Sequence, residues 1–416
     1  MKSVTAEGGR NHSPGKEINK CLDVLACGTA VCGRTVNGVL GKQMAKTITI
    51  NKEIIDFSDC YDFEKVFTYT HLWKSYKKCK EGVNWKASTH KFTANAPLYV
   101  FRLHVALMTG KFKSPGFYEF DIFERGKRRH IKSVRIEERI VQRCLCDYCI
   151  VPVLSRSFIY DNGATLKNKG YDFAINRVHV HLQQHIREHS AKGYVLLFDF
   201  SKFFDNISHE EIKSVLREKF RDQRILKLIF HFIDAFGDIG LGLGSQISQV
   251  LALAAGNKLD HFIKEQLRVK HYVRYMDDGW LLHESKEFLQ QCLERIKEKC
   301  KEYGLVLNER KTHIVKLERG FTFLKVKYFV TETGKIIRKI SSESVTRERR
   351  KLKKLNNRLN CDLLTFKDVV QSYKSWDGHA SRFDSHKTRK SMEKLFTDLF
   401  LRSDQQNEIL QNQAGQ

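Results

Sequence analysis

Proline and long apolar runs are scarce in this chain. Only four of its 416 residues are proline, and no segment is a low-complexity linker or an internal repeat, so we expect one compact, multi-lobed body. No run of about 18 uncharged apolar residues occurs, which excludes a membrane-spanning helix. No secretory signal is evident either. We therefore expect a cytoplasmic protein without a membrane partner.

Acidic residues are also few beside the basic ones. Lys and Arg total 73 and Asp and Glu 48, which gives a formal net charge of +25. This excess predicts a polyanionic partner, which is more often nucleic acid than an anionic membrane surface. Because 41% of the residues are apolar, the chain should fold and bury a core despite its charge.

The cysteines follow no disulfide framework. Eleven are scattered irregularly, which is typical of reduced thiols. Two clusters need weighing for zinc: Cys21, Cys27 and Cys32 in a Gly-rich leader, and Cys144, Cys146 and Cys149 in an apolar helical pattern. The first has no C-x-x-C pair, and small buried thiols explain the second. We assign neither cluster a metal.

Hydrophobic periodicity predicts a mixed chain of the α/β (α+β) class. Alternating runs around a basic glycine turn predict a hairpin at 117–136. An apolar run at 194–200 predicts a buried strand, and residues 271–284 predict two strands about a tight turn. A further strand is expected at 304–308. The residues after about 341 are basic and helical in pattern.

Two strand-borne acidic sites are the most informative feature. Asp277 and Asp278 are flanked by alternating apolar residues and followed by Gly279, which fits a β-turn at a hairpin tip, although D-D-G turns are also common in solvated loops. Asp199 ends an apolar run, and an acid there is costly unless it is paired or binds a metal. Together they suggest a pair of divalent cations on oxygen ligands, as used in in-line phosphoryl transfer.

Motifs in a fixed order resemble those of reverse transcriptases. The matching segments are DFSKFFD (199–205), GSQISQ (244–249), RYMDDGWLL (274–282), GLVLN (304–308) with Lys311 and Thr312, Phe323–Leu324 of a primer-grip strand, and SYKSWDGHA (372–380). The G-x-x-x-S-Q form of the second is typical of bacterial enzymes, such as those of diversity-generating retroelements. The chain therefore resembles a bacterial reverse transcriptase of the retroelement, defence-associated or group II-like type.

This resemblance implies a right-hand polymerase with fingers, an antiparallel-sheet palm and a helical thumb. The expected segments are a flexible leader (1–43), an N-terminal extension with fingers (44–190), a palm with finger elements (191–340), a helical thumb (341–400) and a polar tail (401–416). The implied activity is RNA-directed DNA polymerisation by a two-metal mechanism, in a bacterial or phage retroelement or in antiphage defence. The implied partners are a template RNA, which we expect to be a dedicated non-coding RNA, a DNA product or primer, deoxynucleotides and, as an option, an accessory protein.

The resemblance also implies roles in metal binding and chemistry. Asp199 and Asp277 would hold two Mg²⁺ ions, replaceable by Mn²⁺, with the Phe200 carbonyl contributing and Asp278 acting as an auxiliary ligand or support. Lys311 would act as general acid toward pyrophosphate or would position the triphosphate. The alternative for Lys311 is a solvated lysine.

Further residues are expected to contact nucleotides and nucleic acid. Phe204 stands where these enzymes carry an aromatic side chain that excludes the 2′-hydroxyl of a ribonucleotide. Phe203 should be a core residue, and core packing is also the alternative for Phe204. Gly244 and Gln249 would line the nascent base pair. The hairpin cations that could close over the triphosphate, or contact template phosphates instead, are Lys127, Arg128 and Arg129. The cations expected along the duplex backbone are Arg347, Arg349, Arg350, Lys351, Lys353, Lys354 and Arg358.

Two rival functions stay open. One is a template-independent or protein-primed polymeriser on the same palm, and the other is a non-catalytic RNA-binding scaffold, against which the intact acids argue. Segment 159–170 replaces the Arg-containing finger loop of intron enzymes. The nucleotide contacts of those enzymes are therefore transferred to this chain with least support in that segment. Because maturase DNA-binding and endonuclease motifs are missing, we do not expect intron mobility by target cleavage.

Overall fold

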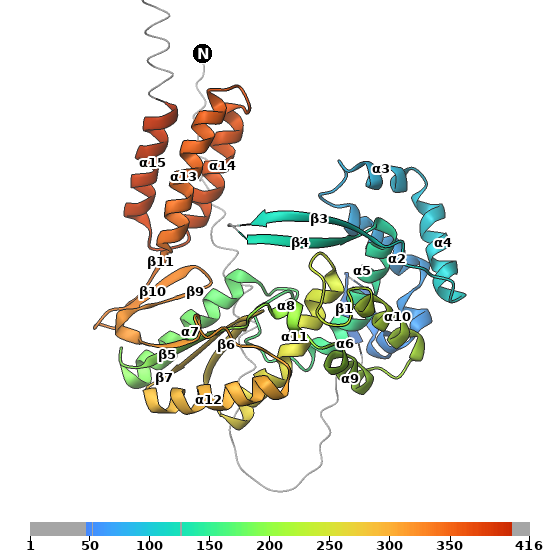
Figure 1. The fold of residues 1–416 in the computed structure, drawn as a ribbon, viewed down its shortest axis with the longest axis horizontal. Coiled ribbons are helices and arrows are strands. Elements are labelled where there is room, and N and C mark those ends of the chain that lie inside the picture. Colours follow the sequence, from blue (N-terminus) through green and yellow to red (C-terminus); the bar gives the residue numbers. More distant parts are fainter. Residues whose placement is uncertain (1–46, 52, 125–126, 402–416) are drawn as a thin grey trace, which may run out of the picture. The chain divides into compact units, whose positions relative to one another are not determined.

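A computed structural model describes residues 47–51, 53–124 and 127–401 (Figure 1). The expected leader and residues 402–416 of the expected tail lie outside the described residues. Within those ranges no helix has the length and apolar character needed to cross a membrane. Helices and antiparallel sheets alternate along the chain, which confirms the α+β class.

The N-terminal elements enclose an aromatic and thiol-rich core. They are β1 (Thr47–Ile50), β2 (Glu53–Asp56), α1 (Phe63–Val66), α2 (Tyr69–Lys80), α3 (Ala87–Ala94), α4 (Ala96–Met108), α5 (Ile136–Leu145) and α6 (Val151–Ser155). Cys144, Cys146 and Cys149 are fully buried here, as expected of small apolar thiols. Burial raises the pKa of each thiol, so all three are protonated at neutral pH.

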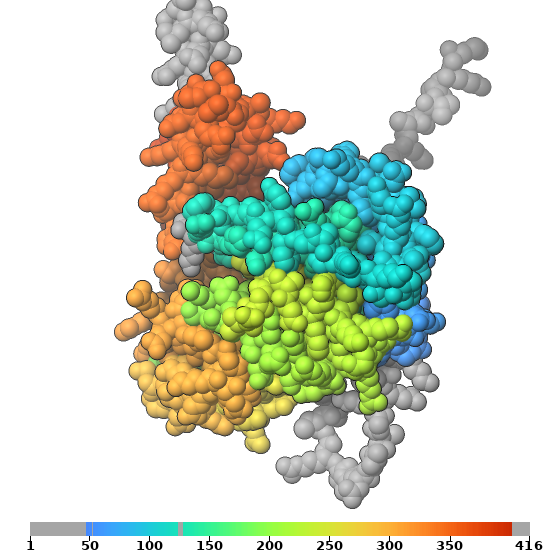
Figure 2. Space-filling model, turned by 45° about the vertical axis from the view of Figure 1, so that its right-hand side comes forward, coloured from blue at the N-terminus to red at the C-terminus, as the bar shows by residue number. Residues whose placement is uncertain are grey.

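The hairpin predicted at 117–136 is present as β3 (Phe117–Glu124) and β4 (Lys127–Val134). Its strands pair in full antiparallel register, with Phe120 opposite Ile131 and Ile122 opposite Arg129. Figure 2 shows the hairpin in teal at the surface of that face of the molecule. Successive side chains point to opposite faces, so Arg128 and Arg129 face opposite ways.

The palm is a four-stranded antiparallel sheet in the order β6-β7-β5-β8. Its strands are β5 (Tyr194–Asp199), β6 (His271–Tyr275), β7 (Asp278–His283) and β8 (His313–Lys316). Val195 and Leu197 of β5 pack in the same cluster as α7 (Tyr171–His189), whereas Leu196 and Phe198 pack with α12 (Lys286–Glu302). Because both faces are covered, β5 is a continuous apolar run rather than an alternating one.

The α-helices between β5 and β6 are α8 (Phe203–Asn206), α9 (His209–Lys219), α10 (Gln223–Asp234) and α11 (Gln246–His261). The strand expected at 304–308 is wrong, since only Leu307 forms an isolated bridge, to Phe200. The chain instead turns at Lys311 and Thr312, whose N–H groups both donate to the Asn308 carbonyl, before β8 begins. Residues 304–308 therefore contact the β5 strand only at the C-terminal end of β5.

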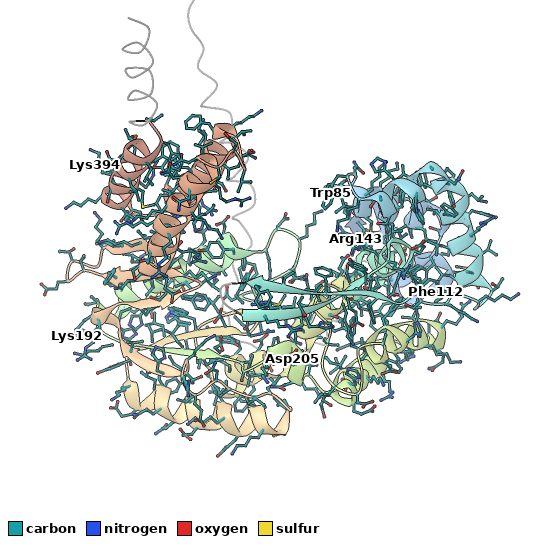
Figure 3. The ribbon with its side chains drawn as sticks, turned by 45° about the horizontal axis from the view of Figure 1, so that its top comes forward. Trp85, Phe112, Arg143, Lys192, Asp205 and Lys394 are labelled. Atoms are coloured by element: carbon teal, nitrogen blue, oxygen red, sulfur yellow. The ribbon has the colours of Figure 1, made fainter. Side chains whose placement is uncertain are left out.

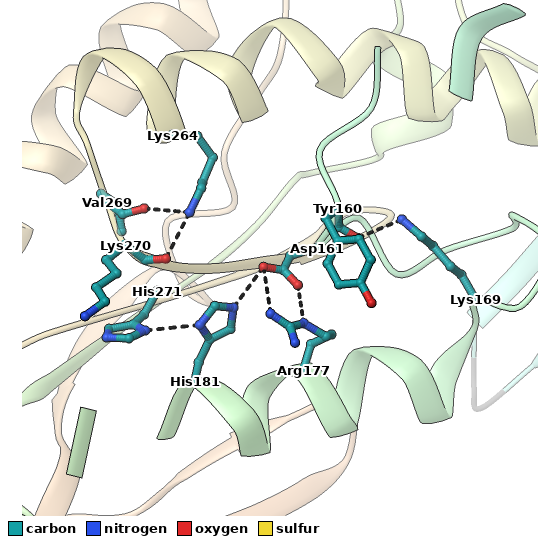
Figure 4. Close-up of polar contacts among 9 residues, drawn as sticks. All are labelled: Tyr160, Asp161, Lys169, Arg177, His181, Lys264, Val269, Lys270 and His271. Carbon is teal, nitrogen blue, oxygen red and sulfur yellow. Dashed lines mark hydrogen bonds and ion pairs between the residues drawn. The ribbon is translucent and has the colours of Figure 1, made fainter. Parts of the chain in front are cut away.

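The loop at 159–170 is attached to the palm by a buried polar network (Figure 4). Asp161 accepts a hydrogen bond from His181 Nε2 at 2.9 Å and also pairs with Arg177. Backbone bonds join Asp161 and Gly163 to Arg274 on β6. The loop therefore has a fixed place beside the hairpin of 271–283 that carries Asp277 and Asp278.

The C-terminal part is a small sheet followed by three helices, as the basic helical pattern predicts. The elements are β9 (Phe321–Phe323), β10 (Val326–Val330), β11 (Ile336–Ile340), α13 (Ser342–Leu359), α14 (Phe366–Ala380) and α15 (His386–Phe400). The helices have a core of their own, centred on Leu352, Trp376 and Phe396. Arg382, which follows α14, pairs with Asp172 of α7 at 2.7 Å.

Candidate active site

Asp199 and Asp278 face each other across two neighbouring strands of the palm. In the register of β5 and β7, Leu197 lies opposite Trp280 and Asp199 opposite Asp278. Directly opposed residues have their Cβ atoms about 4.5–5.5 Å apart on one face of the sheet. The apolar strands thus bring two carboxylates side by side at one end of the sheet.

The third acid, Asp277, stands in the two-residue turn between β6 and β7. Its neighbour Met276 has a φ of 52°, in the left-handed region. Gly279, which the sequence assigned to the turn, lies in β7 instead. A Cβ at Gly279 would lie 2.1 Å from the ring of Phe198, so glycine is needed there for close packing.

The carboxylates oppose one another's ionisation. Burial, followed by the charges of Asp277 and Asp199, raises the pKa of Asp278 to about 7. Burial, with Asp199 adding to it, also raises the pKa of Asp277. Two acids with raised pKa values beside a third make a site that favours a proton or a cation.

Asp199 is also bonded to the segment that follows α12. Lys311 Nζ donates to Asp199 Oδ2 at 2.7 Å, and Asn308 Nδ2 donates to Oδ1 at 3.2 Å. Partial burial opposes the Lys311 charge, but Asp199 and the other two acids outweigh it and raise its pKa. Lys311 is therefore an ion-paired lysine rather than a merely solvated one.

Asn308 is a site residue to which sequence reasoning gave no role. Besides its side-chain bond, its N–H donates to the Asp199 carbonyl at 2.7 Å. The available signal was its place in the G-L-x-L-N motif, four residues after Gly304. Asn308 fixes the segment that carries Lys311 onto the end of β5.

Among the described side chains, no three His, Cys, Asp or Glu residues converge in the arrangement of a preformed metal site. Asp199, Asp277 and Asp278 lie together, but Asp199 is held by Lys311 and Asn308. Mg²⁺ is commonly bound through one or two carboxylates with water and substrate phosphates. The acids are chemically suited to that partial kind of site.

The structure separates the three hairpin cations. Arg129 lies near enough to Asp277 for its guanidinium to act against the burial that raises the Asp277 pKa. Arg128 instead pairs with Asp121 at 2.6 Å on the other face of the hairpin. Of Lys127 only the backbone is described. Of the two arginines, Arg129 is thus the one that the fold brings toward Asp277.

Phe204 and Phe203 differ in burial, as the sequence reasoning required. Phe203 is 5% exposed and stacks on Phe200, whereas Phe204 is half-buried. Both lie on the short helix α8, which also carries the exposed Asp205 labelled in Figure 3. The Phe204 carbonyl accepts from the Leu241 N–H at 2.7 Å.

Gly244 and Gln249 flank the start of α11. Gly244 has a φ of 108°, and a Cβ there would lie 3.1 Å from the Lys132 carbonyl oxygen, so the loop passes close against β4. Ser245 Oγ donates to Gln142 Oε1 at 2.7 Å, which fixes the loop to α5. Gln249 is exposed on α11.

The predicted duplex-binding cations all lie on α13, and all are exposed: Arg347, Arg349, Arg350, Lys351, Lys353, Lys354 and Arg358. Within residues 347–358 the one acidic residue, Glu348, is buried and lies 3.8 Å from Lys351. Glu343, in the first turn of α13, is exposed. Leu352 anchors the helix in the core of the three-helix bundle. The helix thus presents a nearly unopposed basic surface.

An antiparallel palm sheet with three clustered acids, a paired lysine and an arginine beside them defines a nucleotidyltransferase of the polymerase class. Residues 115–328, just over half of the chain, match the family described as reverse transcriptase (RNA-dependent DNA polymerase). The chain belongs to this family, whose members polymerise nucleotides on an RNA template. The resemblance noted from the motifs is confirmed at that level.

Solved structures similar to this chain include two telomerases. Apo telomerase from Candida tropicalis, truncated from its C-terminal domain, is 15% identical with a TM-score of 0.41, and the match covers 53% of this chain and 54% of that one. Telomerase from Candida albicans in complex with a fragment of telomeric RNA is 14% identical with a TM-score of 0.43, with coverage of 68% and 55%. This chain therefore spans about half the length of those chains. No curated protein sequence matches it.

Proposed function

We propose that this chain adds deoxynucleotides to a 3′-hydroxyl on an RNA template, using two divalent metal ions. The observation that carries the proposal is the pairing of Asp199 with Asp278 across the sheet, with Asp277 in the adjoining turn. Like charges directly opposed on a sheet are destabilising unless something compensates them. Burial and the two neighbouring acids raise the pKa of Asp278 to about 7, so a nearby positive charge would stabilise its ionised form.

The residues fit Mg²⁺, and Mn²⁺ as a substitute. Asp199 and Asp277 would hold the ions, with Asp278 as auxiliary ligand and the Phe200 carbonyl as a further oxygen donor, a hard-oxygen set that both cations accept. Bound there, two such ions would supply activation of the attacking hydroxyl and stabilisation of the leaving pyrophosphate. The Asp199–Lys311 contact supports a site that is completed only when substrate arrives.

The chain's own cations and aromatics would orient the nucleotide. Lys311 would hold a proton for the departing pyrophosphate or would position the triphosphate, and Arg129 would supply a second cation from the hairpin. Phe204 would exclude the 2′-hydroxyl, while Gly244 and Gln249 would border the nascent base pair. These roles rest on the motifs together with the placement described above.

The basic surface of α13 would follow the phosphate backbone of an RNA–DNA duplex. A-form helices are recognised largely by shape and backbone contact, which suits a helix of exposed Lys and Arg. We further propose a dedicated template RNA, a DNA primer or product, and a role in a bacterial or phage retroelement or in antiphage defence. The support for that setting is the G-x-x-x-S-Q form of residues 244–249.

Primer extension with and without an RNA template tests the function. Wild type should incorporate deoxynucleotides only with template and divalent metal, and Asp277→Ala with Asp278→Ala should abolish incorporation while RNA binding persists. Asp238→Ala, which changes an exposed aspartate in the loop after α10, is the matched control and should stay active. Incorporation without template would favour the template-independent polymeriser. RNA binding without incorporation by wild type would favour the scaffold.

A further inference from the structure

Arg274 of β6, three residues before Asp277, forms a fully buried ion pair. Its Nε and Nη2 atoms donate to the two carboxylate oxygens of Asp260 on α11, each at 2.7 Å. Both side chains are 0% exposed. This is a bidentate, planar contact in a setting where water cannot compete.

The same guanidinium reaches the turn that carries the acids. Arg274 Nη1 donates to the Met276 carbonyl at 2.9 Å, and Nη2 also donates to the Leu253 carbonyl of α11 at 3.1 Å. Met276 has a φ of 52°, a left-handed conformation that is strained for a bulky side chain and persists only where the surroundings fix it. The Arg274 hydrogen bond is such a constraint, one residue before Asp277.

The helix behind Arg274 is shaped for the guanidinium. A Cβ at Gly256 would lie 2.6 Å from Arg274 Cζ and 2.7 Å from Nη1, so any other residue would displace the group. Tyr272, two residues earlier on β6, donates its hydroxyl proton to Asp260 Oδ1 at 2.7 Å rather than to the turn. A change at Gly256 would therefore disturb the contact of Arg274 with the turn, whereas a change at Tyr272 would disturb only the support of Asp260.

Stability alone is a weak explanation for this arrangement. Burying an ion pair costs desolvation, and well-packed apolar residues often replace one without loss. What apolar residues cannot supply is a directed donor for the Met276 carbonyl. We propose that Arg274 is a positioning residue that, held by Asp260 and cradled by Gly256, fixes the Met276 turn and with it the placement of Asp277 and Asp278. The catalytic part of this inference rests on the proposed function; the structural part does not.

The test compares three variants of the full chain. Arg274→Lys keeps the charge but loses the fork, and Gly256→Ala keeps the arginine but displaces it; Tyr272→Phe, which removes only a bond to Asp260, is the control. Hydrogen exchange of a peptide spanning 275–279, measured on the metal-free protein, should accelerate in the first two variants and stay at the wild-type rate in the third. Template-directed kcat should fall by roughly 10- to 100-fold in the first two, as expected of sub-ångström misplacement, with the deoxynucleotide KM and the RNA Kd nearly unchanged.

The outcomes separate the two claims. A double variant that combines Arg274→Lys with Gly256→Ala should lose no more kcat than Arg274→Lys alone, because both changes act on one contact. If exchange in the turn is unchanged, or if kcat falls only in proportion to the melting temperature in all three variants, Arg274 is structural and the proposal is overturned. If exchange accelerates as expected but wild type polymerises nothing, the turn is still fixed by Arg274 and the proposed function fails instead. Should Arg274→Lys not fold, Gly256→Ala decides.

Discussion

Lys311 and Asp199 are joined by an ion pair with Nζ 2.7 Å from Oδ2, although 112 residues separate them. The Asp199 side chain is 7% exposed and that of Lys311 56%. The lysine therefore covers one oxygen of a buried acid from the solvent side, and Asn308 covers the other. Any cation that binds Asp199 must therefore compete with Lys311 and Asn308 for the carboxylate oxygens.

The first prediction concerns this competition. Lys311→Met should lower template-directed incorporation by about 10- to 100-fold, since it removes a positioned acid or triphosphate ligand. The same change should strengthen Mn²⁺ binding in the absence of nucleotide, because Asp199 loses its competing cation. Calorimetric titration with Mn²⁺ and primer extension measure the two effects. Lys316→Met on β8 is the control, and equal effects from both lysines would contradict the assignment.

The second prediction is a pH dependence of stability. Burial, then the charges of His181, His185 and Lys270, lower the pKa of His271 to about 3, with Glu188 acting weakly the other way. His271 shares a hydrogen bond of 3.1 Å with His181, which is held in turn by Asp161 (Figure 4). Below pH 6.5 the unfolded chain binds a proton at this position and the folded chain does not, so stability falls as the pH drops toward 3.

For His271 the expected loss between pH 7 and pH 5 is about 2 kcal/mol. His271→Asn should reduce the difference in unfolding free energy between these pH values by that amount, whatever it does to stability at pH 7. Urea unfolding at both pH values measures it. His313→Asn, at an exposed site on β8, should leave the difference unchanged. An unaltered pH difference in His271→Asn would show that another group carries the acid sensitivity.

The strands and acids of the palm could be predicted because their signals are local. A run of apolar residues ending in Asp199, and alternation on both sides of Asp277, require only nearest-neighbour reasoning about burial. The register that opposes Asp199 to Asp278 is supplied by the structure. This is why the acidic cluster was accessible from sequence.

The residues that hold the cluster could not be predicted in the same way. Arg274 is visible in the motif, but its partner Asp260 lies on a helix, and only the packing of α11 behind β6 brings the two together. Gly279 looked like a turn glycine because D-D-G is a common turn pattern, yet the ring of Phe198 is what requires it. Residues 304–308 looked like a strand, but they meet the sheet at a single bridge.

The third prediction tests the basic surface of α13. Replacing Arg350 and Arg358 by Gln should weaken binding to an RNA–DNA hybrid and reduce the slope of log Kd against log salt, by about 0.7–0.9 for each phosphate that the variant no longer neutralises. The charge-matched control is Lys297→Gln together with Lys301→Gln, both on α12, where Lys297 is half-buried and Lys301 exposed. Binding measured at a series of salt concentrations distinguishes the two pairs. Equal slopes would mean that α13 lies off the duplex path.

The fourth prediction separates the proposed sugar gate from the core. Phe204 is half-buried and Phe203 buried on the same short helix, where adjacent side chains point about 100° apart. Phe204→Ala should raise ribonucleotide relative to deoxynucleotide incorporation by about 10- to 100-fold, or roughly 1.4–2.8 kcal/mol of lost discrimination, with little change in the deoxynucleotide rate. Phe203→Ala should instead cost about 3–5 kcal/mol of stability and leave sugar selectivity unchanged. Sugar selectivity and melting temperature, measured for both variants, give the answer. If Phe204→Ala melts the protein and leaves selectivity intact, the ring is core packing and the gate lies elsewhere.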